Sequence, residues 1–191
     1  MTNITGSGVP AWGEYAITQS PQWFDVIAGA VTRYNIVGLS KVASSDANDA
    51  NDATLVLNIP AGEVILQRAG RFIVCGSTYV QGSVENADTN ATIDVMGSLV
   101  FRIPNHPQLD PGIRTHELRL GQTVIAMSPS GNMQDSGFSF SGCTTLMLPE
   151  GTKVSLRVGI FADNLTQGKF LNWQARDDSA KSGAHLSIHE I

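Results

Sequence analysis

The last eight residues of the chain, AHLSIHEI, contain two of its four histidines, His185 and His189. Their alternation of apolar and polar residues predicts a β-strand, on which side chains four positions apart point to the same side. Three copies of such a strand around an axis could bind a metal through imidazole nitrogens, which suit zinc or nickel. We favour the simpler interpretation, in which both histidines are bonded to neighbours in an interface, and we predict no metal site.

A second group of possible metal ligands is the stretch DANDANDA, residues 46–53. Calcium binds oxygen ligands of this kind, but the glycine and the bidentate glutamate that complete an EF-hand loop are missing. Asp and Asn also favour turns, so we predict a solvated loop and no cofactor. The oxygen-bearing residues are Asp46, Asn48, Asp49, Asn51 and Asp52.

The other two histidines, His106 and His116, flank the proline-rich stretch RIPNHPQLDPGIRTHE. A catalytic triad can be assembled there on paper only, because a triad is defined by geometry and the sequence contains neither Gly-x-Ser-x-Gly nor His-Glu-x-x-His. We therefore predict an ordinary long loop, no catalytic residue and no enzyme activity. The acids and serines considered are Asp110, Glu117, Ser128 and Ser141.

The two cysteines, Cys75 and Cys143, lie far apart and lack the CxxC spacing of metal and redox motifs. We favour two buried free thiols, since a free cysteine behaves as a small apolar residue. A disulfide between them would require neighbouring strands whose Cα atoms come within about 7 Å.

Composition excludes several classes of protein. The 191 residues carry a net charge of −5 and no run of Lys or Arg, which argues against nucleic acid or an anionic membrane as the main partner. No apolar stretch approaches the ~20 residues that cross a bilayer. The first fifteen residues lack the features of a signal peptide, so we expect synthesis in a cytoplasm.

The elements that position these residues are short strands. Alternating apolar residues occur in VILQRAGRFIVCGSTYV, in THELRLGQTVIAMS through Leu118, Leu120, Val124 and Ala126, and in TTLMLPEGTKVSLRV around a Pro-Glu-Gly turn. No stretch has a helical period over three turns. Many short strands separated by turn residues predict an all-β fold, an antiparallel jelly-roll sandwich over residues 31–191.

Residues 1–30 differ from the rest, because they combine Gly, Ser and Pro with four large aromatic residues. Gly and Pro argue against a regular element, whereas a flexible tail needs no such aromatics. We predict an extended N-terminal arm that docks either on a larger assembly or on its own domain. Its proposed anchor residues are Trp12, Tyr15, Trp23 and Phe24.

Three blocks resemble the C1q/TNF-like jelly-roll family: VILQRAGRFIVCGSTYV, TTLMLPEGTKVSLRV and the terminal AHLSIHEI. Lys153 departs from the family pattern, which often has an acid there, and this puts a ligand role for that position in doubt. The resemblance implies a homotrimer with the terminal strand in the inner sheet, beside the threefold axis. The implied interface residues are His185, Ser187, His189 and Ile191.

Such domains are similar to those found on bacteriophage particles, as capsid-decorating trimers and as fibre heads. We therefore expect a non-enzymatic virion structural protein that decorates or stabilises a capsid and contacts the major capsid protein or another virion component. The expected location is the virion surface, after synthesis in the host cytoplasm. The alternative is a receptor- or glycan-binding head of a fibre or spike.

Overall fold

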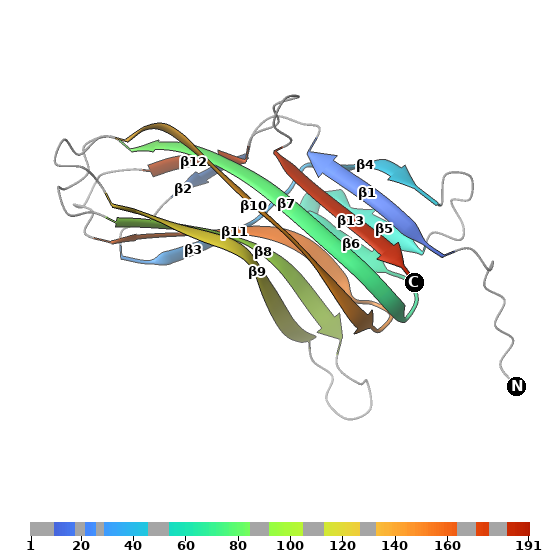
Figure 1. Ribbon diagram of the computed structural model, residues 1–191. Coiled ribbons are helices and arrows are strands. Elements are labelled where there is room, and N and C mark those ends of the chain that lie inside the picture. The colour runs from blue at the N-terminus through green and yellow to red at the C-terminus, as the bar shows by residue number, and fades with distance from the viewer. Residues whose placement is uncertain are drawn as a thin grey trace, which may run out of the picture.

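Figure 1 presents a computed structural model of the chain, in which two β-sheets face each other. Within the residues that the structure describes, the only helix is a short 3-10 turn, η1 (Ile59–Ala61), and no helix is long and apolar enough to span a membrane. The fold is an antiparallel jelly-roll sandwich, as the sequence predicts. The described residues are 10–17, 22–25, 29–45, 54–84, 92–104, 113–126, 133–163, 171–175 and 183–191.

Sheet A has the strand order β2-β12-β7-β13-β1-β4, and β10 pairs with the other edge of β7. The terminal strand β13 therefore lies between β7 and β1, antiparallel to both (Figure 1). Its strands are β1 (Trp12–Ile17), β2 (Gln22–Asp25), β4 (Leu39–Ser44), β7 (Gly70–Val84), β10 (Met133–Leu148), β12 (Leu171–Ala175) and β13 (Ala184–Glu190).

Sheet B has the strand order β5-β6-β11-β8-β9, and β3 extends the edge of β11 beyond β6. The predicted Pro-Glu-Gly turn joins β10 of sheet A to β11 of sheet B, with Gly151 in the left-handed region at φ 79°. Its strands are β3 (Val31–Asn35), β5 (Leu55–Asn58), β6 (Glu63–Leu66), β8 (Thr92–Pro104), β9 (Ile113–Ala126) and β11 (Lys153–Asp163).

The core lies between the sheets and contains the alternate residues that the sequence pattern assigns to it. On β7, Phe72 and Val74 are fully buried, and on β13 so are Leu186 and Ile188. Burying one side chain of this size contributes about 1.5–3 kcal/mol. The intervening residues of the same two strands, which include Cys75, His185 and His189, therefore point to the outer face of sheet A.

A β-bulge overturns the predicted alternation at the end of β9. The register between β8 and β9 shifts at Gly97/Ser98, and one extra residue on a strand reverses the facing of every residue beyond it. Leu118 and Leu120 pack against the core as expected, but Val124 is 62% exposed. The sequence gives no sign of the bulge, since Gly97 and Gly121 are paired only in the folded sheet.

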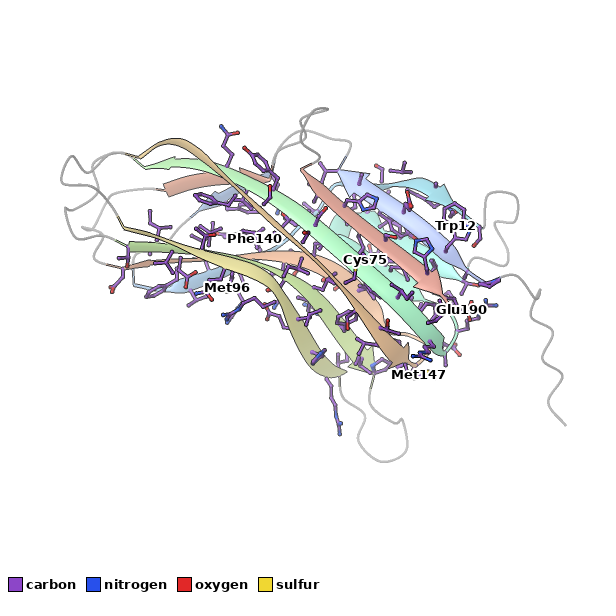
Figure 2. All side chains as sticks on the ribbon, viewed as in Figure 1. Trp12, Cys75, Met96, Phe140, Met147 and Glu190 are labelled. Atoms are coloured by element: carbon purple, nitrogen blue, oxygen red, sulfur yellow. A yellow bond between two sulfur atoms is a disulfide. The ribbon has the colours of Figure 1, made fainter. Side chains whose placement is uncertain are left out.

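Phe140 of β10, labelled in Figure 2, packs against two glycines of sheet B. A Cβ atom at Gly97 would be 2.8 Å from the Phe140 Cβ, and one at Gly121 would be 2.7 Å from the Phe140 Cδ1. These contacts are too short for any side chain. The glycines therefore make room for the Phe140 ring, which is 5% exposed.

Residues 10–17 and 22–25 are part of this fold, so the described part of the predicted arm lies on its own domain, which is one of the two predicted alternatives. Trp12–Ile17 is strand β1, paired with β13 and β4, and Gln22–Asp25 is strand β2 at an edge of sheet A. Tyr15 and Phe24 are fully buried in the core. The stretch WGEYAI alternates like the other strands, but a glycine at an inward position obscured the pattern.

Candidate assembly face

The outer face of sheet A brings together all four residues that the sequence assigned to an interface. His185, Ser187 and His189 point outward from β13, and Ile191 follows the strand with 59% of its surface exposed. Each of the three β13 residues is paired across the sheet with outward-facing residues of β1, β7 and β10, and we call each such line of paired residues a row. Whether copies of the chain meet on this face stays a prediction.

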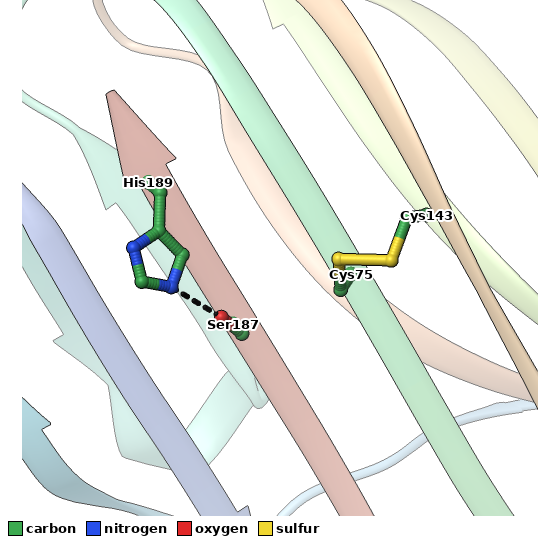
Figure 3. Close-up of a disulfide and its surroundings, with 4 residues drawn as sticks. All are labelled: Cys75, Cys143, Ser187 and His189. Atoms are coloured by element: carbon green, nitrogen blue, oxygen red, sulfur yellow. Dashed lines mark hydrogen bonds between the residues drawn. A yellow bond between two sulfur atoms is a disulfide. The ribbon is translucent and has the colours of Figure 1, made fainter. Parts of the chain in front are cut away.

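Trp12 and His189 stack on this face, with ring centroids 6.1 Å apart and ring planes 8° from parallel. The two residues are directly opposite each other on β1 and β13. The Nε2 atom of His189 lies 2.7 Å from the Ser187 Oγ, as Figure 3 shows. Trp12 therefore packs on its own sheet, and this leaves less of the ring for a separate anchoring contact.

His185 lies near the only carboxylate in these rows. Its Nε2 is 3.9 Å from the Glu14 Oε2 on β1, and both side chains are about two-fifths exposed. An exposed pair at this distance contributes little to stability. Among the described residues no three His, Cys, Asp or Glu side chains lie close enough to hold a metal ion.

Cys75 and Cys143 form a disulfide between β7 and the edge strand β10 of the face (Figure 3), which corrects the prediction of two free thiols. The cysteines are directly opposite each other on β7 and β10, with Cα atoms 4.0 Å apart. Cys75 is half-buried and Cys143 is exposed. The row continues through Ser187 to Glu14. Sequence alone could not pair the cysteines, because the strand register that brings them together is a long-range property.

One end of the face carries two exposed apolar side chains, on either side of Arg71. Met147 on β10 is 73% exposed and projects from the end of the strand, as Figure 2 shows. Arg71 is its partner on β7, and the Arg71 carbonyl accepts a hydrogen bond from the Ile191 N–H at 2.9 Å. Ile191, Arg71 and Met147 thus form the last row. The alternation of Cys143, Thr145 and Met147 is the sequence signal that could have revealed this row.

The outer face of sheet B is different, because charged pairs cover it. Glu63, 3% exposed, accepts a hydrogen bond from Arg102 at 3.0 Å, and the Lys153 Nζ lies 3.9 Å from its second oxygen. Arg157 pairs with Glu117 at 3.4 Å. These ion pairs alone bring three cationic side chains and two carboxylates to this face, whereas the rows of sheet A carry Glu14, Arg71 and two histidines.

The remaining candidates that the structure describes are not brought together. His116 and Glu117 are exposed on β9, in a strand rather than the predicted loop, and Ser141 is exposed on β10. His106, Asp110 and Ser128 lie outside the described residues, as do Asp46–Asp52. The position of Trp23 on β2 is described, but its side chain is not.

No protein-family model matches the sequence, and no curated protein matches it. Solved structures of similar fold include the Eiger TNF of S. frugiperda, which covers 96% of this chain and 94% of its own at 14% identity and a TM-score of 0.47. The structure of murine APRIL covers 96% of this chain and 100% of its own, at 10% identity and a TM-score of 0.43. The globular domain of the zebrafish complement 1qA protein covers 95% of this chain and 96% of its own, at 14% identity and a TM-score of 0.38.

The structural neighbours are thus TNF, APRIL and C1q globular domains. At such identities and TM-scores the similarity transfers no function to this chain, and the jelly-roll assignment depends on its own strand order.

Proposed function

We propose that this chain is a non-enzymatic structural protein that acts as a homotrimer, with the outer face of sheet A around the threefold axis. The observation that carries the proposal is the composition of that face. Its rows contain small and weakly polar side chains, one disulfide, the Trp12–His189 stack and the exposed apolar side chains of Met147 and Ile191, and their charged residues are limited to Glu14, Arg71 and the two histidines when protonated. Interface cores are poor in charged residues and rich in aromatic residues and Met.

The contrast with sheet B supports the choice of face. Glu63 and Glu117 are held in ion pairs on sheet B, and covering such pairs would remove charges from water at a cost. Few charges on sheet A would need to be desolvated. The threefold arrangement is the one that the resemblance of the three sequence blocks to C1q/TNF-like jelly-rolls implies.

A matched pair of substitutions tests this proposal. Thr145 is exposed on edge strand β10 of sheet A, and Thr115 is exposed on edge strand β9 of sheet B. We expect Thr145→Glu to give a monomer in multi-angle light scattering, because it would place three carboxylates in the interface, and Thr115→Glu to stay trimeric. A wild-type chain that is monomeric at micromolar concentration would refute the proposal.

The finer proposal is that the trimer decorates or stabilises a bacteriophage capsid at the virion surface. It is supported by the resemblance to particle-bound jelly-rolls, and a surface-exposed disulfide is compatible with that location. Tyr15 and Phe24 are buried in the core and Trp12 belongs to the proposed trimer face, so Trp23 is the anchor candidate that remains for contact with the major capsid protein. Quantitative mass spectrometry of purified particles tests it: many copies per particle support decoration, whereas a few copies favour a receptor-binding fibre tip.

A further inference from the structure

The Cys75–Cys143 disulfide occupies a position that can couple redox state to assembly. It joins edge strand β10 to β7, in the row that continues through Ser187 of the central strand β13. Cys143 is exposed in the single chain and Cys75 is half-buried. A thiol reductant can therefore reach the Cys143 sulfur in the monomer, and a second chain seated on this face would cover it.

The bond also fixes an edge of the face. Strand β10 pairs with β7 alone among the described strands, through a register that runs from Met133 to Leu148. Phe140 and Leu148 anchor β10 in the core at 5% and 2% exposure. Loss of the disulfide would leave these anchors and the backbone hydrogen bonds in place. The fold would persist, but the covalent link between β10 and the centre of the sheet would be lost.

The assembling surface depends on that link. Thr145 and Met147 lie on β10, two and four residues beyond Cys143 on the same side of the strand. Edge strands open more readily than central ones. Without the disulfide, the part of the face that lies on β10 therefore samples more conformations. Assembly would then have to order it again, at a cost in entropy.

We propose that the disulfide-bonded chain is the assembly-competent form, and that assembly in turn protects the bond from thiol reductants. This inference rests on the proposed trimer. In the reaction, an external thiolate attacks the Cys143 sulfur, the Cys75 thiolate leaves and takes up a proton, and a second thiolate releases Cys143. With dithiothreitol the products are the cyclic disulfide of the reagent and two protein thiols. At equilibrium this coupling is reciprocal: if the disulfide favours assembly, assembly favours the disulfide over the two thiols to a matching degree.

The first experiment compares rates of reduction. Wild type and Ile191→Glu, which places a charge at the far end of the face and is expected to be monomeric, are treated with dithiothreitol, and free thiols are counted over time. We expect slower reduction of the trimer than of the monomer, because the rate of thiol–disulfide exchange depends on access to the sulfur that is attacked. Equal rates in a trimeric wild type and a monomeric variant would overturn this inference and leave the trimer standing.

The second experiment removes the bond. Cys75→Ser with Cys143→Ser is expected to retain the far-ultraviolet spectrum of a β protein and to assemble about tenfold more weakly in sedimentation equilibrium. Assembly as tight as that of the wild type would also overturn the inference. If the double variant does not fold, the reduction rates decide. A wild type that is monomeric at every concentration contradicts the proposed function itself.

Discussion

Ala11 and Glu190 are joined by two hydrogen bonds, although 179 positions separate them in the sequence. The Glu190 N–H donates to the Ala11 carbonyl at 2.7 Å, and the Ala11 N–H donates to the Glu190 Oε2 at 3.0 Å. Arg68 donates to the same carboxylate oxygen. Ala11, the residue that precedes β1, thus holds the end of β13 in the sheet through these hydrogen bonds.

This contact predicts a pH dependence of stability. Burial raises the pKa of Glu190, but hydrogen bonds from Arg68 and from the Ala11 N–H, together with the Arg68 charge, outweigh it and hold the pKa below the ordinary 4.5. A lowered carboxyl pKa stabilises the fold fully above the unfolded-state value, and this contribution is lost as pH falls through the folded-state value. We expect the melting temperature of wild type to fall more steeply below about pH 4.5 than that of Glu190→Gln.

Thermal melts across the acidic range measure this difference. Glu150→Gln, in the exposed turn between β10 and β11, is the control and should follow the wild-type curve. Parallel curves for wild type and Glu190→Gln would contradict the assignment of a stabilising role to this carboxylate.

Two buried threonines predict opposite effects of the same substitution. The Thr78 hydroxyl, on a side chain 1% exposed, has no hydrogen-bond partner within the described part of the chain, whereas the fully buried Thr152 hydroxyl donates to the Pro149 carbonyl at 2.7 Å. Thr78→Val removes an unpaired polar group and should stabilise the fold by about 1 kcal/mol. Thr152→Val should destabilise it by about 1 kcal/mol. Urea unfolding measures both, and shifts of the same sign would contradict this account.

The sequence was most informative where facing is a local property. Strict alternation placed Val74 and Ile188 in the core and the histidines of β13 outside, because side chains on a regular strand have a period of two. It failed where facing depends on a distant partner. The exposure of Val124 follows from a bulge opposite β8, and the disulfide follows from the register of β7 with β10. Neither pairing leaves a mark in the local pattern.

The aromatic residues near the N-terminus show the same limit and yield a third prediction. Phe24 is fully buried and lies 5.0 Å from the Tyr34 ring, whereas Trp12 is half-buried on the outer face. Phe24→Ala should cost about 3–5 kcal/mol of stability. Trp12→Ala should cost less and should weaken the proposed trimer, because the Trp12–His189 stack belongs to its interface. Urea unfolding and sedimentation read the two effects separately, and a trimer indifferent to Trp12→Ala would place the interface elsewhere.

The last prediction concerns the terminal strand itself. Deleting residues 186–191 removes most of β13 from between β7 and β1, together with two fully buried side chains, Leu186 and Ile188. The facing backbone groups of β7 and β1 would lose their hydrogen-bond partners inside a sheet. We expect no soluble, cooperatively folded product. Deleting Ile191 alone is the control, because it removes an exposed side chain and one hydrogen bond to Arg71 but leaves the pairing of Ala184–Glu190 with β7 and β1 in place, so that chain should still fold and melt cooperatively. A longer truncation that stays soluble and melts cooperatively would mean that sheet A does not need its central strand, and the closure of the fold by its last residues would be wrong.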